Sequence, residues 1–513
     1  MKRGEYDKTV LVIGGGPTAW EMSRSLAQDG LPVMVAAPED AERADMPSGV
    51  EWISGAQVTD VIGQVGDFAV WLKAGGKRFE RRAGAIILAL DANRQPGALP
   101  AGAAFGERIR AMTEAEDVLF GRQGHPSLRR VIVLDRLDGL STAASHERLL
   151  RFAVRVQEEC NATVYVLTSQ VKVASIGLEI LYGRLRDGGG LVVKPDAVQV
   201  ETGDDAVRVR FRDTVLDEDV VLEADMMVAA EDEAPSPELE HLAGLLRIER
   251  DKQGFLQADN VLRRPCLTNR RGVLSVGSSA APSTKWDTEQ GVTAAVSEIR
   301  ELYRWIEEED HPDTILYNRD FCAFCLTCFR VCPHGAIHFT DRPNFLPLAC
   351  QRCGLCAAAC PGEALELVGY EKETFFKTLS GLKPLDVEGS KRIVAIACTK
   401  SAGRVLNAAP ADAEIRKGLA WVEVQCAGTI RTTSLLRLLA RPGLVDGVLV
   451  LACHNGNCRS GTGTVVAKNL VESIKVLLKA IGADPGRIGY ISTAANDEVE
   501  LVRQITAFRD GLR

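Results

Sequence analysis

The 513-residue sequence has no long hydrophobic run. Its longest apolar stretches, such as residues 85–90 and 448–453, fall far below the about 18 residues that a membrane-spanning helix requires. The start, MKRGEYDK, leads into a short VLVIGGG segment without the apolar core or cleavage site of an export signal. We therefore expect a cytoplasmic chain without a membrane span of its own, which a partner could attach to a membrane.

An excess of basic residues and the common catalytic motifs are also missing. The chain has 61 Lys and Arg against 69 Asp and Glu, so its net charge of −8 argues against nucleic acid as a partner. It contains no G-x-S-x-G, P-loop or H-E-x-x-H motif, and its seven histidines are scattered. The sequence therefore predicts no catalytic residue for covalent chemistry on a substrate.

Cysteine is scarce in the first 320 residues, where only Cys160 and Cys266 occur. We interpret these two as ordinary buried or loop thiols. The other twelve of the 14 cysteines follow residue 320. Because a reducing cytoplasm disfavours disulfides, this concentration of thiols indicates metal or redox chemistry.

Eight of these cysteines form two copies of the pattern C-x2-C-x2-C-x3-C-P. The pattern is the bacterial ferredoxin run, in which three thiolates ligate one iron–sulfur cluster and the fourth ligates the other. Two zinc knuckles are the alternative, but they would leave the third cysteine and the proline of each run without a role. The spacing therefore predicts two [4Fe–4S] clusters, one held by Cys322, Cys325, Cys328 and Cys360, the other by Cys332, Cys350, Cys353 and Cys356.

The last four cysteines are predicted to meet at one edge of a parallel sheet. Three strand-like segments, RIVAIAC, WVEVQC and GVLVLAC, end at a cysteine, and helical patterns follow two of them. The carboxyl ends of parallel strands gather ligands at the same edge. Buried inert cysteines are the alternative, which suits one such position better than three. We expect a [2Fe–2S] cluster on Cys398, Cys426, Cys453 and Cys458.

The chain opens with a turn of the dinucleotide-binding kind. A short apolar strand at residues 10–13 runs into GGGPTA and a helical pattern. In this G-x-G-x-x-A turn, Gly14 permits the bend, Gly16 lets a pyrophosphate approach, and Ala19 keeps helix and strand close. The acidic residue expected at the end of the second strand is replaced by Ala37, with Glu39 two places later.

An internal repeat indicates two dinucleotide-fold halves. Residues 65–90 and 205–230 each predict a hairpin of alternating strands followed by a buried strand. The second half opens at VIVLDRLDGLSTAA without a glycine fingerprint, so we expect no nicotinamide site. A strand, a turn at Gly277-Ser278 and a helix close the unit, and that turn would face a flavin.

Two families are similar to parts of this sequence. Residues of about 390–510, with VQCAG and LACHNGNC, resemble the delta subunit of methyl-viologen-reducing hydrogenase, although Ser401 stands where that family usually has a second cysteine of C-x2-C. Residues of about 8–370 resemble the A subunit of heterodisulfide reductase, which implies FAD and iron–sulfur clusters. The fusion also resembles the B subunit of quinone-interacting membrane-bound oxidoreductase.

These observations predict an α/β protein with four parts: a flavin-binding two-dinucleotide-fold domain at 1–305 (NAD-like half about 127–230), a 2[4Fe–4S] ferredoxin domain at 306–370, a linker at 371–391, and a small parallel-sheet [2Fe–2S] domain at 392–513. We expect an electron-transfer subunit of a multisubunit oxidoreductase rather than a stand-alone catalyst. Its partners would be hydrogenase-, formate dehydrogenase-, heterodisulfide reductase- or quinone-linked subunits. The alternatives are a flavin enzyme acting directly, including one that bifurcates electrons, and a flavin-free iron–sulfur scaffold.

Overall fold

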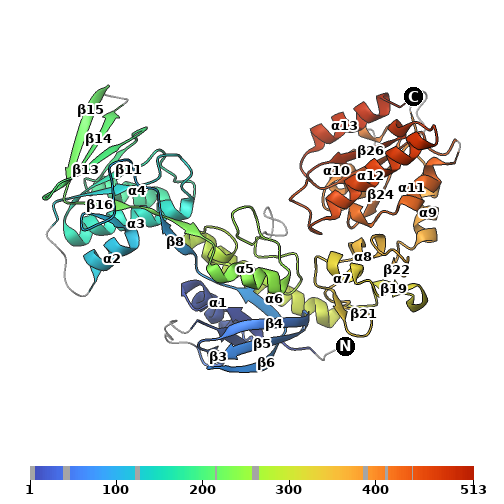
Figure 1. Cartoon of the computed structure of the whole chain (residues 1–513), viewed down its shortest axis with the longest axis horizontal. Coiled ribbons are helices and arrows are strands. Elements are labelled where there is room, and N and C mark those ends of the chain that lie inside the picture. Colours follow the sequence, from blue (N-terminus) through green and yellow to red (C-terminus); the bar gives the residue numbers. More distant parts are fainter. Residues whose placement is uncertain are drawn as a thin grey trace.

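The computed structural model describes residues 6–38, 47–121, 128–213, 217–256, 265–384, 391–410, 414–441 and 443–512. Figure 1 shows the order of its parts: one dinucleotide-fold half at the left, the other at the lower centre, and the ferredoxin region at the right beneath the C-terminal domain. No helix among the described residues is long and apolar enough to cross a membrane.

The first half is built on a five-stranded parallel sheet. Its strands β1, β2 and β7 are buried at all four positions, which explains their continuous apolar sequence. The helices α1 (Pro17–Gln28) and α6 (Lys285–Glu308) pack on it, and a hairpin sheet of β4, β5 and β6 adjoins it. The order is β18-β7-β1-β2-β3, with β1 Val10–Ile13, β2 Val33–Ala36, β3 Val50–Ile53, β4 Gln57–Gln64, β5 Asp67–Ala74, β6 Lys77–Ala83, β7 Ala85–Leu88 and β18 Val273–Ser275.

The second half repeats this plan, as the internal repeat predicts. Its parallel sheet has the order β12-β11-β10-β16-β9 and starts at β9, ahead of residue 127. The two halves are joined by an antiparallel pair, β8 (Asn93–Pro96) with β17 (Glu231–Ala234), which no local sequence pattern predicts. The remaining elements are β9 Ile109–Ala111, α2 Met112–Phe120, β10 Arg130–Leu134, α3 Ala143–Cys160, β11 Thr163–Leu167, α4 Leu178–Asp187, β12 Leu191–Val193, β13 Gln199–Thr202, β14 Val207–Asp213, β15 Glu218–Ala224, β16 Met226–Ala229 and α5 Pro237–Leu246.

The ferredoxin region has two short antiparallel pairs and two short helices. Strand β19 (Ile315–Tyr317) pairs with β22 (Leu365–Leu367), and β20 (Ile337–Phe339) pairs with β21 (Pro343–Phe345). Its apolar core is small, so other interactions must hold its loops in place. The helices are α7 (Thr327–Val331) and α8 (Leu355–Ala358).

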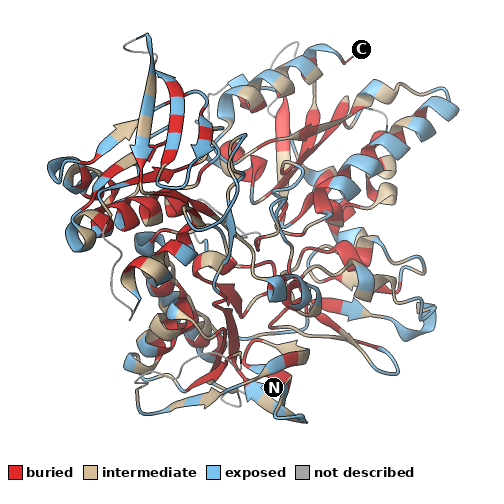
Figure 2. Cartoon of the chain, turned by 60° about the vertical axis from the view of Figure 1, so that its left-hand side comes forward, coloured by how far each residue is buried: buried red, intermediate tan, exposed pale blue. Residues whose placement is uncertain are grey.

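The C-terminal domain is the predicted parallel sheet with helices on both faces. Its four strands have the order β24-β23-β25-β26, and separate cores lie on the two sides of the sheet. Figure 2 shows its strands as buried and the outer faces of its helices as exposed. The elements are β23 Ile393–Cys398, α10 Ala402–Ala408, β24 Leu419–Val424, α11 Thr432–Leu439, β25 Gly447–Ala452, α12 Gly463–Ala480, β26 Ile488–Ser492 and α13 Glu498–Asp510.

Residues 371–391, predicted as a linker, include a packed helix. Helix α9 (Lys372–Gly381) places Phe375 and Leu379 in the core that covers one face of the C-terminal sheet. Residues 385–390 lie outside the described part. The first half of the join therefore belongs structurally to the C-terminal domain, because its aromatic and aliphatic side chains add to that core.

Candidate iron–sulfur site

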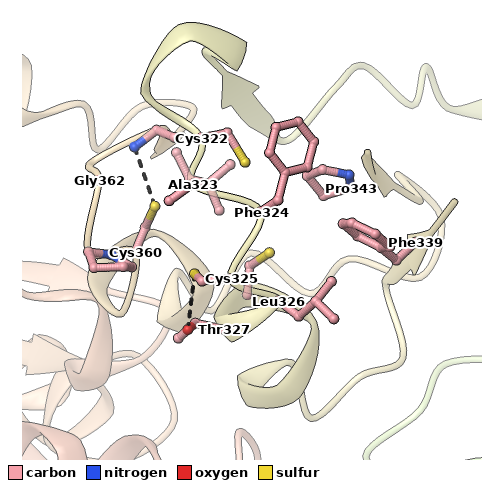
Figure 3. Close-up of a pocket in the computed structure, with 14 residues that line it drawn as sticks. Cys322, Ala323, Phe324, Cys325, Leu326, Thr327, Phe339, Pro343, Cys360 and Gly362 are labelled. Carbon is pink, nitrogen blue, oxygen red and sulfur yellow. Dashed lines mark hydrogen bonds between the residues drawn. The ribbon is translucent and has the colours of Figure 1, made fainter. Parts of the chain in front are cut away.

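The first four ferredoxin cysteines that spacing groups together line one cavity. Cys322, Cys325 and Cys328 come from the loop and helix α7 of the first motif, whereas Cys360 reaches the cavity from the second motif (Figure 3). Pro361 lines the same cavity. The crosswise arrangement that the sequence predicts is therefore present in the fold.

The loop around this cavity is shaped to present sulfur atoms. Phe324 and Leu326 adopt left-handed backbone conformations on either side of Cys325, which turns the chain tightly. Hydrogen bonds with Thr327 lower the pKa of the Cys325 thiol, and the two side chains lie 3.3 Å apart (Sγ to Oγ1). The Ala364 amide donates to Cys360 Sγ over 3.3 Å. Such bonds favour thiolate, which is the form that ligates iron.

The second set of four also lines a single cavity, formed by Cys332, Cys350, Cys353 and Cys356. This cavity lies deeper in the protein. Burial raises the pKa of Cys353 to about 12, and it also raises the pKa of Cys356 well above its usual value. Thiolates in such surroundings need a nearby positive charge, which the iron atoms of a cluster supply.

The last four cysteines gather at the carboxyl edge of the C-terminal sheet, as predicted. Cys398 ends β23, Cys453 follows β25, and their Sγ atoms lie 3.5 Å apart. Cys426, just after β24, is hydrogen-bonded to Cys458. Hydrogen bonds within these two pairs lower the pKa of Cys398 to about 7 and that of Cys458 to about 6, while the pKa values of their partners are raised.

Two small residues complete this third site. Any side chain at Gly463 would collide with Cys426 Sγ and lie 3.2 Å from Cys458 Sγ, so the start of α12 must be glycine to leave room for sulfur. Ser401, at the position where the delta family usually has cysteine, is buried, and its hydroxyl lies close enough to the thiols of Cys398 and Cys453 to favour their thiolate forms. Sequence reasoning leaves the place of Ser401 open; the structure puts it beside the sulfur atoms.

The second and third sites are in contact. One buried cluster of side chains contains Cys353 and Leu355 of the ferredoxin region and all four cysteines of the C-terminal site. At the same contact, Gly354 packs on Thr429 and Gly428 packs on Leu355, too closely for a side chain at either glycine. The two sites therefore lie next to each other inside the protein.

Cys160 and Cys266 take no part in these sites. Cys266 is buried in the core of the first half, and Cys160 packs at the edge of the core of the second. Both are ordinary thiols in structural terms.

The predicted dinucleotide turn is present at the head of α1. Gly14 has a left-handed φ of 142°, and a side chain there would collide with the carbonyl of Ala89 and lie 3.3 Å from Ala19. The turn at Gly277-Ser278 packs against Thr18 of the same helix. Gly14, Gly16 and Ala19 thus lie in one turn with Gly277-Ser278 beside it, whereas Glu39 lies outside the described residues.

An acidic side chain that sequence reasoning did not single out lies at this point. The Asp91 carboxylate sits so close to Gly16 that any side chain on that glycine would collide with it. It accepts hydrogen bonds from the backbone and hydroxyl of Thr18, at the N-terminus of α1, and desolvation raises its pKa. A pyrophosphate would need the same space and the same donors, so the turn in this arrangement does not fit a flavin dinucleotide. The sequence feature that could have indicated this side chain is the segment LALD, which leads from the end of strand β7 to Asp91.

A second carboxylate approaches from the other half. Glu233 of β17 accepts hydrogen bonds from the Ser278 hydroxyl at 3.2 Å and from the Ser283 amide at 3.3 Å. Burial raises its pKa. The closing turn is thus held by an acidic side chain, which adds to the negative character of the region.

Family models match the rear of the chain. Residues 314–374 match the 4Fe-4S dicluster domain, and residues 393–513 match the methyl-viologen-reducing hydrogenase delta subunit. Both matches coincide with the cysteine sites described above, so the chain carries both kinds of domain.

Relatives are found among the A subunits of heterodisulfide reductases. The chain is 25% identical over 346 residues to the A subunit of the ferredoxin:CoB-CoM heterodisulfide reductase of Methanosarcina mazei, which covers 66% of this chain and 43% of that protein. An iron-sulfur A subunit of the CoB–CoM heterodisulfide reductase of Methanopyrus kandleri is 29% identical over 190 residues, 36% of this chain and 28% of that protein. The chain therefore spans less than half the length of these relatives. Homology to this kind of subunit is confirmed, as the sequence resemblance predicts.

Among solved structures, a thioredoxin reductase of T. acidophilum aligns with 58% of this chain and 99% of its own, at 14% identity and a TM-score of 0.39. The assignment of two dinucleotide-fold halves to the front part rests on the observed strand order of its two parallel sheets.

Proposed function

We propose that this protein is an electron-transfer subunit that passes electrons through two [4Fe–4S] clusters and one [2Fe–2S] cluster between partner redox proteins. The observation that carries the proposal is the buried contact between Cys353 and the four C-terminal cysteines, which makes the second and third sites neighbours. Family matches to a dicluster ferredoxin and a hydrogenase delta subunit support the same conclusion.

The proposed ligands are the three sets of four thiols already described. Their donor chemistry fits iron–sulfur clusters, since each set is all cysteine and the sets have the sequence order of a dicluster ferredoxin. Zinc is the competing occupant. Zinc sites use four ligands in two separated pairs, which would leave the third cysteine of each ferredoxin run without a role.

The first cluster would be the point of contact with a partner. Cys325 is exposed, and the nearby Phe321 and Phe324 are large apolar side chains that also face solvent. Leu316 and Phe321 line a depression beside Pro361. Electron transfer needs the redox centre of a partner to come close, and this is the exposed end of the proposed path. Such partners would be hydrogenase-, formate dehydrogenase-, heterodisulfide reductase- or quinone-linked subunits.

No electron step is assigned to a flavin, because Asp91 occupies the turn where its pyrophosphate would bind. This observation favours a second candidate function for the front part, a scaffold that holds the ferredoxin region. Contacts of that kind are present: Arg247 donates to the carbonyl of Phe329 over 3.2 Å, and Arg271 donates to that of Leu348 over 2.8 Å. The proposed location is the cytoplasm, where reduced thiols persist.

Anaerobic purification followed by metal, acid-labile sulfide and flavin analysis tests this function. The relay requires about ten iron atoms per chain, from two clusters of four and one of two. About four irons or fewer in fully reconstituted protein, or stoichiometric zinc, would contradict it. One flavin per chain would show that Asp91 does not exclude the cofactor, and would favour a relay that contains a flavin. Activity of the isolated chain on small substrates would favour a flavin enzyme acting directly.

A further inference from the structure

A polar cavity lies where the first half, the ferredoxin region and the C-terminal domain meet. We call it the junction cavity; its volume is about 410 Å³, and it adjoins the cavity of the second cysteine set, with which it shares the wall residues His334, Cys350 and Gln351. That size suits a small organic molecule rather than a single inorganic ion. Each of the three units contributes to its wall, among others through Arg271, Trp305, Gln351, Arg352, Lys400 and Arg459.

The wall of the junction cavity is rich in positive charge. Four cationic side chains line it: Arg271, Arg352, Lys400 and Arg459. The two acidic residues in the wall, Glu309 and Asp310, are exposed to solvent. Cationic groups gathered from three units around a recess attract an anion, and a bound anion would offset their mutual repulsion.

The positive charges around the cavity affect the ionisation of Arg271. Burial lowers the pKa of its guanidinium to about 10, and the neighbouring charge of Arg459 is the next cause. Arg271 also stacks over the ring of Trp305, 4.4 Å from its centroid, which fixes the direction of the guanidinium. A fixed guanidinium presents several donors in one plane, the geometry that phosphate and carboxylate groups match.

Two buried hydrogen-bond acceptors in the same wall indicate which polar groups the ligand carries besides its anionic group. His334 is 1% exposed, its Nδ1 lies 2.6 Å from the Asn269 carbonyl oxygen, and its Nε2 has no hydrogen-bond partner in the described part of the chain. Since Nδ1 donates, Nε2 is an acceptor. Gln351 donates from Nε2 to the same carbonyl over 3.0 Å, and its buried Oε1 also lacks a described partner. Buried acceptors of this kind call for N–H or O–H donors.

We propose that the junction cavity binds a phosphorylated heterocycle of mononucleotide size, whose phosphate meets the cationic side chains and whose N–H or O–H groups meet His334 and Gln351. The wall includes Cys350, Gln425 beside Cys426, and Arg459 beside Cys458. A ligand here would therefore lie next to the second and third cysteine sites. The inference rests on the cavity and its charges, and does not require the proposed clusters.

Isothermal titration of the full chain with FMN, riboflavin and inorganic phosphate tests the proposal. FMN carries both the phosphate and an N–H-bearing ring; riboflavin lacks the phosphate, and phosphate lacks the ring. We expect one FMN site, with riboflavin and phosphate each bound at least tenfold more weakly, because each loses one of the two sets of contacts. FMN should also quench tryptophan fluorescence through Trp305 of the wall. No FMN binding at millimolar concentration, or equal affinity for riboflavin, would overturn it.

Charge variants locate the site. Lys400 is exposed, so Lys400→Gln should fold normally and weaken FMN about tenfold, as should Arg459→Gln. The matched control is Lys468→Gln, an exposed lysine on α12 outside the cavity wall, which should leave the affinity unchanged. FMN binding that both cavity variants leave intact would place the ligand elsewhere, at the dinucleotide turn for example, and would refute the proposal. Iron content measured on the same samples reports separately on the proposed relay.

Discussion

Cys353 of the ferredoxin region and Cys426 of the C-terminal domain lie in the same buried cluster of side chains, and each belongs to a different set of four thiols. Leu355, two residues after Cys353, fills the space in front of Gly428. The first ferredoxin set is in turn linked to the second, because the Cys328 thiol is close enough to influence the pKa of Cys356. The three sites thus form a series from the exposed Cys325 to the interior of the C-terminal domain.

Replacing Cys353 should interrupt this series in the middle. In Cys353→Ala we expect a loss of about four iron atoms per chain and of the signal of one cubane cluster, since a cubane needs all its ligands. Iron analysis and low-temperature electron paramagnetic resonance would measure both. Cys160→Ser is the control, because Cys160 packs at the edge of the core of the second dinucleotide half, away from the three sites. Unchanged iron in Cys353→Ala would contradict the ligand assignment.

The contact between the two domains depends on close backbone approach at Gly428. A Gly428→Val side chain would collide with Leu355 and with the backbone of Gly463, so we expect destabilisation of about 1–3 kcal/mol and weaker retention of the third cluster. Thermal unfolding and iron content after dilution into chelator report the two effects.

The matched control for Gly428 is Gly291→Ala in helix α6. A side chain at Gly291 meets nothing within 4 Å, so alanine there should preserve or slightly raise stability. A wild-type melting temperature in Gly428→Val would show that the observed contact is not maintained in solution.

The grouping of the cysteines could be predicted because it depends on local spacing and on strand ends. The third site follows in the same way from Cys398 and Cys453 at the ends of neighbouring parallel strands. Other features depend on contacts between distant segments. The junction cavity needs Arg271 and Lys400 from different units, and β8 pairs with β17 across the two halves, so no local pattern carries either signal. The sequence predicts a linker where helix α9 lies, because the apolar side chains of this helix pack on the C-terminal sheet and have no partner within their own segment.

Ser401 should tune the third cluster without holding it. Its buried hydroxyl lies close enough to the thiols of Cys398 and Cys453 to favour their thiolate forms, and a hydrogen bond from it to sulfur would stabilise the reduced, more negative cluster. In Ser401→Ala we expect unchanged iron content and a reduction potential lower by roughly 20–60 mV, the one-electron equivalent of about 0.5–1.5 kcal/mol for one hydrogen bond. A redox titration followed by electron paramagnetic resonance measures the shift. Loss of iron in this variant would instead indicate that Ser401 is a ligand.

Asp91 should control whether the dinucleotide turn accepts a flavin. Its carboxylate lies against Gly16 and takes the donors of Thr18 that a pyrophosphate would use. Removing the charge and the bulk in Asp91→Gly, or the charge alone in Asp91→Asn, should strengthen FAD binding about tenfold or more, since like charges placed together cost several kcal/mol. Equilibrium dialysis with FAD measures this, and Asp67→Asn, an exposed residue of β5, is the control.

The pH dependence of FAD binding distinguishes repulsion by Asp91 from a general effect of the substitution. Desolvation raises the pKa of Asp91, so the neutral acid becomes populated at a less acidic pH than for a free aspartate. The neutral form repels a phosphate less, and wild-type affinity for FAD should therefore rise as the pH falls from 8 towards about 5. Asp91→Asn has no such proton to gain and should lose this part of the pH dependence. If the wild-type chain instead holds one FAD at every pH, and neither substitution changes the affinity, the carboxylate does not close the turn in solution.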